Sequence, residues 1–309
     1  MAKIKFRSVK LSKANKERLE TINEIIEEYQ AQGYKLTLRQ LYYQLVSRDV
    51  IPNLLPEYAK LSNLLKEGRM GGIVDWDAIE DRLRKPSVPG SWDSPKDILK
   101  TALYSYKKPR MKGQSTYLEV WVEKDALSGV LKRITEKYHV PIVVNRGYSS
   151  ATAMFDAFER FKDAESEEQY TKKIIYLGDF DPSGIDMIRD INDRICEFIR
   201  GHYNWSNDTS NYELANEFSF SVLPIALTRE QIRLYNPPPN PAKKTDPRAK
   251  DFIKTHGSTS WEVDALRPDV LNSILEKAIL DNIDIKLYES VVYQEKSEKA
   301  KLKQFIETF

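Results

Sequence analysis

The sequence predicts an α/β protein in which a helical N-terminal domain precedes a mainly parallel sheet and a C-terminal helical extension. Apolar residues recur at helical spacing through the first 85 residues, whereas short apolar runs alternate with amphipathic stretches from residue 116 onward. One of these runs ends in two carboxylates, Asp179 and Asp181, directly before a Pro and a nearby Gly that favour a turn. A chain of 309 residues is long enough for two domains with substantial cores.

Residues 1–85 are predicted to form a winged-helix-like domain. Helices are expected over residues 15–30, over residues 38–48 with Thr37 as N-cap, and from Pro56 to the Gly71-Gly72 pair. A short strand over residues 73–76 and a further helix to about residue 83 complete this pattern. Winged-helix and helix-turn-helix variants often dock on DNA, although many modules of this shape bind none.

Residues 86–115 contain several Pro and Gly residues and are predicted to be a linker with one helix around residues 98–106. Residues 116–309 then alternate between strands and helices, which predicts a mainly parallel sheet with helices on both faces. Strands are expected at 117–122, 141–145, 173–177 and 218–225, and helices at 125–138, 150–161, 183–200 and 228–234, followed by two closing helices.

Composition narrows the class of protein. No run of about 18 apolar residues is present, so no membrane span is expected, and the N-terminus lacks the apolar core of a signal peptide. Cys196 is the only cysteine, which excludes an internal disulfide and predicts a cytoplasmic protein. The three histidines are too scattered for a zinc site, so any metal is expected on carboxylates.

Positive charge is concentrated in two stretches, although the net charge of the chain is only +2. One is the segment 1–18, which carries seven Lys and Arg residues against a single acid. The other consists of Lys107, Lys108, Arg110 and Lys112. Each stretch fits ordinary solvated surface as well as it fits contacts to nucleic-acid phosphates.

Three carboxylates are expected to meet at one edge of the sheet. Asp179 and Asp181 alternate along an extended segment and therefore point the same way. Glu123 follows the first strand of the α/β region, and the carboxyl ends of parallel strands open on one edge. A lone Asp-x-Asp is more often a solvated acidic turn, but the added Glu123 favours a Mg²⁺ site formed by all three residues.

These motifs resemble the Toprim domain, a Rossmann-like fold with a mainly parallel sheet. Val122-Glu-Lys-Asp-Ala126 followed by Asp179-x-Asp-Pro-x-Gly184 is similar to the form found in the A subunit of topoisomerase VI and in the related meiotic double-strand-break transesterase. The segment 146–149 is similar in part to a Gly-Tyr-Pro segment of that family, with Ser149 in place of the Pro. Candidate DNA-binding residues are Lys124, Arg146, Lys107, Lys108 and Arg110.

A second resemblance concerns a tyrosine in the helical domain. The same family carries an Arg-x-x-Tyr-Tyr pattern, which Arg39-Gln-Leu-Tyr42-Tyr43 matches. The resemblance makes Tyr43 the candidate nucleophile and Arg39 its partner. Helical geometry places Tyr42 in the apolar stripe and Tyr43 about 130° from its middle, on the flank of Arg39. The alternative is a surface tyrosine that stacks on Arg39.

The resemblance implies Mg²⁺-dependent cleavage of double-stranded DNA by tyrosine transesterification, with Glu123 as a ligand and general acid/base. It also implies a homodimer, a nucleoid-associated location and, for strand passage, a separate ATPase subunit, because the chain has no Gly-x-x-x-x-Gly-Lys-Ser/Thr loop. The alternatives are a Toprim nuclease that uses a metal-activated water and a DNA-binding protein without catalysis. Residues 236–264 have no clear counterpart in the family. Their acids Glu262 and Asp264 are expected to begin a helix, and the alternative is that they complete the metal site.

Overall fold

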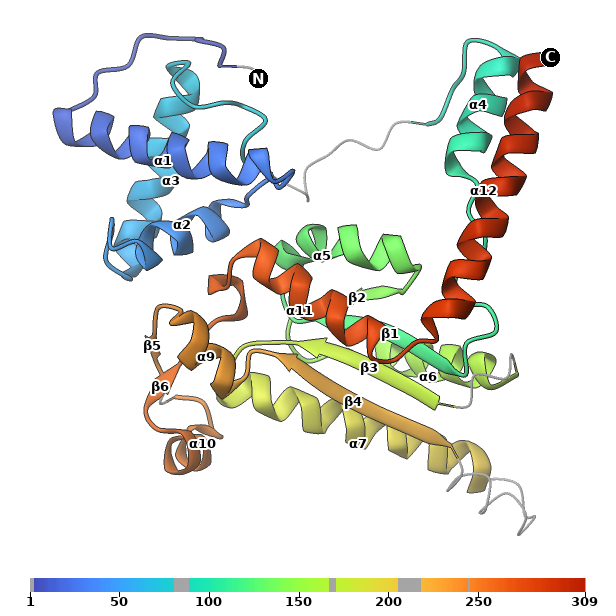
Figure 1. Ribbon diagram of the computed structural model, residues 1–309. Coiled ribbons are helices and arrows are strands. Elements are labelled where there is room, and N and C mark those ends of the chain that lie inside the picture. The colour runs from blue at the N-terminus through green and yellow to red at the C-terminus, as the bar shows by residue number, and fades with distance from the viewer. Residues whose placement is uncertain (1–2, 81–88, 167–170, 205–217, 244, 309) are drawn as a thin grey trace.

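The computed structural model describes residues 3–80, 89–166, 171–204, 218–243 and 245–308 (Figure 1). Its N-terminal part contains the three helices expected there: α1 (Lys13–Ala31), α2 (Leu38–Ser47) and α3 (Leu55–Met70). Ser12 caps α1, and Thr37 begins α2 in a reciprocal capping box with Gln40. The apolar faces of the three helices pack into one core that includes Leu19, Leu41 and Leu65.

The segment after α3 differs from its prediction. Residues 73–76 form turns instead of a strand, and residues 77–80 are not helical. The rest of the predicted helix, residues 81–83, lies outside the described residues. Isolated bridges join Lys5 to Gly71 and Leu36 to Ile79. Gly72 has a φ of 73°, which a glycine adopts without strain, and the turn there follows directly from the end of α3.

A parallel four-stranded sheet forms the centre of the described α/β region, as the alternation of strands and helices predicts. The strand order is β2-β1-β3-β4, and each neighbouring pair is parallel. The strands are β1 (Thr116–Val122), β2 (Ile142–Val144), β3 (Thr171–Leu177) and β4 (Ser219–Ala226). The sheet thus places the carboxyl ends of β1 and β3 side by side.

Helices cover both faces of this sheet (Figure 1). Val120 and Val122 join a core with α5 (Asp125–Tyr138) and α11 (Pro268–Leu280). Trp121, on the other face, joins a core with α6 (Ala151–Ser166) and α7 (Pro182–Asn204). This alternation follows from the period of two along a strand.

The remaining elements extend the domain on two sides. Near the sheet edge lie α9 (Arg229–Tyr235), β5 (Asn240–Pro241), α10 (Ala249–His256), β6 (Thr259–Ser260) and the short 3₁₀ helix η1 (Val263–Ala265). On the other side, α12 (Ile285–Thr308) runs beside α4 (Pro95–Ser105), so the predicted linker contributes a packed helix (Figure 1). In the described part of the chain, no helix is long and apolar enough to span a membrane.

Glu119, in the middle of β1, is a fully buried carboxylate with four donors around it. Arg160 binds it through two nitrogens at 2.6 and 3.0 Å, Trp121 Nε1 donates to it at 2.7 Å and the Tyr117 hydroxyl at 3.0 Å. These bonds tie α6 to the central strand and compensate for the burial of the charge.

We predict that Glu119→Ala lowers the free energy of unfolding by about 3 kcal/mol, because it leaves buried donors without an acceptor. Urea denaturation monitored by circular dichroism measures this change. The control is Glu159→Gln, which removes a half-exposed ion pair with Lys162 on the same helix and should cost less than about 1 kcal/mol. Equal effects of the two substitutions would contradict a structural role for Glu119.

Candidate functional site

The candidate site lies at the carboxyl ends of β1 and β3, where Glu123 and Asp179 meet as predicted. Val122 and Leu177, the last residues of the two strands, are in register. The backbone N–H of Asp179 donates to Glu123 Oε2 at 3.1 Å. Two carboxylates from separate segments are thereby held close together by the parallel pairing of their strands.

Asp181 takes a different position from its neighbour. Its Oδ1 atom accepts hydrogen bonds from Ser183 Oγ at 2.9 Å and from the Gly184 N–H at 2.6 Å, so it caps the start of α7. A Cβ atom on Gly184 would lie 2.2 Å from the carbonyl oxygen of Asp179, which explains why glycine stands there.

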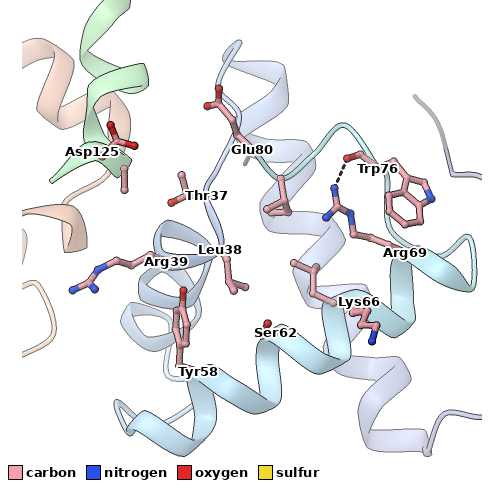
Figure 2. A pocket seen from close by; sticks show the side chains of 13 residues that line it. Thr37, Leu38, Arg39, Tyr58, Ser62, Lys66, Arg69, Trp76, Glu80 and Asp125 are labelled. Carbon is pink, nitrogen blue, oxygen red and sulfur yellow. Dashed lines mark hydrogen bonds between the residues drawn. The ribbon is translucent and has the colours of Figure 1, made fainter. Parts of the chain in front are cut away.

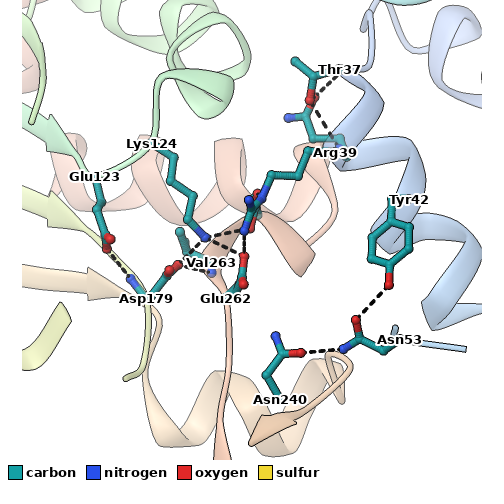
Figure 3. Close-up of polar contacts among 12 residues, drawn as sticks. Thr37, Arg39, Tyr42, Asn53, Glu123, Lys124, Asp179, Asn240, Glu262 and Val263 are labelled. Atoms are coloured by element: carbon teal, nitrogen blue, oxygen red, sulfur yellow. Dashed lines mark hydrogen bonds and ion pairs between the residues drawn. The ribbon is translucent and has the colours of Figure 1, made fainter. Parts of the chain in front are cut away.

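Lys124 fills the space in front of Asp179 (Figure 3). Its Nζ atom lies 2.8 Å from Asp179 Oδ1, 2.8 Å from Glu262 Oε2 and 3.0 Å from Asp264 Oδ1. Asp179 Oδ1 also accepts the N–H of Val263 at 2.9 Å. One ammonium group therefore neutralises carboxylates from two segments that are far apart in the sequence.

A short antiparallel bridge fixes these two segments to each other. The Phe180 N–H donates to the Trp261 carbonyl at 2.8 Å, and the Trp261 N–H donates back at 3.0 Å. The residues that flank the bridge are Asp179 and Asp181 on one segment and Glu262 on the other. The bridge therefore sets the separation between their carboxylates.

Arg39 of α2 joins the helical domain to the same cluster. Its Nε atom donates to Asp264 Oδ2 at 2.6 Å, and its Nη2 atom pairs with Glu262 (Figure 3). A second link runs from Tyr42 through Asn53 to Asn240 on β5, with hydrogen bonds of 3.1 and 2.7 Å. Together these contacts bring α2 against the sheet edge of its own chain.

Tyr43 lies near this cluster and is buried, so the alternative of a surface tyrosine is wrong. Its exposed fraction is 5%, the same as that of Tyr42. The reason is tertiary: η1 packs against α2, and its Ala265 belongs to the same core. The Arg39 guanidinium lies over the Tyr43 ring, 5.7 Å from its centroid, so the predicted stacking is present.

Burial changes the acidity of the central groups. The pKa of Tyr43 is raised above its ordinary value by burial and then by the charge of Asp264, while Arg39 and Asn240 act in the opposite direction. Burial, followed by the charge of Asp179, raises the pKa of Glu123 to about 7. The pKa of Asp179 is raised as well, again by burial, although Lys124 opposes that shift.

The donor types fit a hard divalent cation, but the present arrangement is not that of a metal site. Within the described ranges, no group of three or more Asp, Glu, His or Cys side chains is placed to hold a metal ion. Asp181 is turned to cap α7, and the Lys124 ammonium lies against Asp179. A Mg²⁺ ion on Glu123, Asp179 and Asp181 therefore requires Asp181 to rotate and Lys124 to withdraw.

The predicted DNA-binding residues do not form one surface. Lys124 is directed into the cluster, and Arg146 is exposed 3.6 Å from Asp125 beside the sheet edge. The other three lie against α12, with Lys107 and Arg110 on Glu295 and Lys108 on Glu298. Carboxylates of the same chain thus pair with these three cations, which a count of charges along the sequence does not reveal.

Glu262 and Asp264 lie in the site, which the sequence offered only as the alternative to a helix start. They were expected to begin a helix, and η1 does start at Val263, but their carboxylates bind Arg39 and Lys124. The available signal was their spacing, an acid-x-acid pattern like that of Asp179 and Asp181.

In comparisons with known proteins, no protein-family model and no curated protein matches the chain.

We predict that Glu123→Gln makes the metal-free protein more stable at alkaline pH. The pKa of Glu123 in the folded protein is about 7, above its ordinary value of 4.5. Ionised Glu123 therefore destabilises the fold: this cost is absent below pH 4.5, grows as the pH rises, and is complete above pH 7. The variant should match the wild type near pH 4 and exceed it by up to about 3 kcal/mol at pH 8.

Denaturant titrations at several pH values in the presence of a chelator measure this difference. Glu136→Gln, on the exposed face of α5, is the control and should leave the pH profile unchanged. Parallel profiles for the wild type and Glu123→Gln would show that the carboxyl of Glu123 carries no such cost.

Proposed function

We propose that this protein is a Mg²⁺-dependent DNA strand-cleaving enzyme of the topoisomerase VI A type, with Tyr43 as its nucleophile. The observation that carries the proposal is the meeting of α2 with the sheet edge. Arg39 binds Asp264, which shares Lys124 with Asp179, and Asp179 in turn contacts Glu123. A tyrosine, two cations and a set of carboxylates are thereby gathered within one chain.

The metal in this proposal is held by Glu123, Asp179 and Asp181. Two neighbouring carboxylates, both with raised pKa values, are a place where a divalent cation relieves repulsion. Bound Mg²⁺ supplies neutralisation of phosphate charge and stabilisation of the departing 3′-oxygen.

The remaining chemistry belongs to side chains of the chain itself. The Arg39 guanidinium binds the phosphate under attack and stabilises the phenolate of Tyr43. The Tyr43 oxygen forms a bond to phosphorus as the bond from phosphorus to the 3′-oxygen breaks, which leaves a 5′-phosphotyrosyl link and a free 3′-hydroxyl. Glu123 is the residue that accepts and returns the proton in this proposal.

Hydrolysis by water is the second candidate, and the burial of Tyr43 favours it. A phenol whose pKa is raised by burial is a weak nucleophile, whereas a metal-activated water needs no tyrosine. In that reaction Glu123 and Asp179 keep their roles, and Tyr43 is a packing residue beneath Arg39.

The partners follow from the substrate. Cleavage of both strands of a duplex needs two sites, so a homodimer remains part of the proposal even though α2 faces the carboxylates of its own chain. Strand passage would add a separate ATPase subunit, and double-stranded DNA as substrate implies a nucleoid-associated location.

The central prediction is a covalent adduct between the protein and DNA. Wild-type protein incubated with labelled duplex and Mg²⁺, then quenched with detergent, should carry DNA that migrates with protein. Tyr43→Phe should abolish this adduct because the attacking oxygen is gone. Tyr42→Phe is the matched control, since Tyr42 is equally buried but directs its hydroxyl to Asn53 and Leu54.

The same assay separates the two candidates. Nicks with free ends that survive Tyr43→Phe but are lost in Asp179→Ala would support hydrolysis and reject transesterification. Binding of DNA without any cleavage, independent of metal, would reject both and leave a DNA-binding protein.

We also predict that Mg²⁺ stabilises the fold through the carboxylates. Millimolar Mg²⁺ at pH 8 should raise the unfolding temperature of the wild type by a few degrees, because ligand binding to the folded state adds stability. The increase should be lost in Asp179→Ala and retained in Glu136→Gln. Equal shifts in all three proteins would place the metal elsewhere.

A further inference from the structure

Glu262 is bound by two cations that come from different parts of the chain. Arg39 reaches it from α2 through Nη2, and Lys124 reaches it from the turn between β1 and α5, with Nζ 2.8 Å from Oε2. Both cations use the same oxygen atom, Glu262 Oε2. A guanidinium and an ammonium that converge on one anionic oxygen form the arrangement by which proteins bind phosphate groups.

The two acids of this segment differ in how firmly they are held. Asp264 is fully buried and contacts Arg39 Nε at 2.6 Å and Lys124 Nζ at 3.0 Å. The Glu262 side chain is 25% exposed and lies at the open side of the same cations. Asp264 cannot leave without uncovering a buried charge, whereas Glu262 can turn into solvent.

We propose that Arg39 and Lys124 form a phosphodiester-binding site, and that Glu262 is its built-in competitor, which a backbone phosphate of DNA displaces. Asp264 is a positioning residue that keeps both cations in place during this exchange. The inference rests on the proposed function for the identity of the ligand as DNA, but the exchange itself needs neither metal nor cleavage.

Charge explains why displacement, and not simple addition, is expected. Lys124 and Arg39 face three carboxylates, those of Asp179, Glu262 and Asp264. A phosphate bound beside Glu262 would bring a fourth negative charge into a partly buried cluster. A phosphodiester that takes the place of Glu262 exchanges one monoanion for another and leaves the charge of the cluster unchanged.

A cavity adjoins Arg39 on the side of the N-terminal helices. A cavity of about 600 Å³ lies between α2, α3 and the start of α5, and Arg39 forms part of its wall (Figure 2). The Arg39 side chain is 41% exposed, and the cavity is also lined by Lys66 and Arg69 and by the acids Glu80 and Asp125. The cavity therefore leaves Arg39 accessible to a ligand from this side, with charges of both signs along its wall.

The test is the affinity of Glu262→Gln for DNA in the absence of metal. A fluorescently labelled single-stranded oligonucleotide is titrated in chelator and read by anisotropy, so that no cleavage occurs. Glutamine retains the shape and an acceptor oxygen but loses the charge that competes with phosphate. The dissociation constant should fall about tenfold, as expected for the loss of a partly buried competing charge.

The control is Glu276→Gln, which also removes one negative charge but lies away from Arg39 and Lys124. Glu276 accepts from Lys137 Nζ at 2.6 Å and from the Tyr138 hydroxyl at 2.7 Å, so its surroundings resemble those of Glu262. Its affinity for the oligonucleotide should stay within about twofold of the wild type, since charges beyond a Debye length are screened. Glu262→Asp, which keeps the charge but shortens its reach, should give a smaller gain than Glu262→Gln.

A double variant identifies the site. In Glu262→Gln/Lys124→Gln the gain should disappear, because one of the two phosphate-binding cations is gone. The inference is overturned if Glu262→Gln binds no more tightly than Glu276→Gln, or if the gain persists in the double variant. Thermal unfolding of each protein verifies that the compared variants are folded.

These outcomes are separable from the proposed function. Tighter binding by Glu262→Gln without any covalent adduct or nick in Mg²⁺ would support the inference and reject strand cleavage. An adduct in the wild type together with unchanged affinity in Glu262→Gln would support cleavage and reject the role of Glu262.

Discussion

The ion cluster around Lys124 is the interaction on which the arrangement of this molecule depends. Its ammonium lies between the carboxylate of Asp179, which follows β3, and those of Glu262 and Asp264 at η1. Asp264 also forms an ion pair with Arg39 of α2. Without these cations, three carboxylates would be held together in a partly buried place with nothing to offset their repulsion. The same contacts hold α2 against the sheet edge. The ion pairs that offset the charges of the site therefore also fix the N-terminal helices to the α/β region.

The sequence alone predicted the sheet and its carboxyl edge well, because both depend on local patterns. Apolar runs and their spacing located the strands and the helices between them, and the helix predicted at residues 125–138 has those bounds as α5. The contact between Glu123 and Asp179 followed from a general property of parallel strands, whose ends open on the same edge. Asp181 did not follow, since an aspartate three residues before a glycine at a helix start serves equally well as a cap.

The features that the sequence did not predict all depend on contacts between distant segments. A helical wheel gives the stripe that α2 buries against its own domain, but it contains no information on η1, which covers the flank where Tyr43 lies. Likewise, Glu295 and Glu298 form ion pairs with three cations that precede them by more than a hundred residues. A charged side chain is available to a ligand only when no group of its own chain already pairs with it. That pairing is known only from the fold.

The bridge between Phe180 and Trp261 joins the two segments that carry the acids of the site. Its two backbone hydrogen bonds clamp the segment of Asp179 to that of Glu262, so both sets of backbone atoms behave as one rigid block attached to the sheet. Arg39, in contrast, reaches this block from α2 through the end of its side chain. The acids therefore keep their positions relative to one another, whereas their distance to Arg39 also depends on how α2 packs against η1.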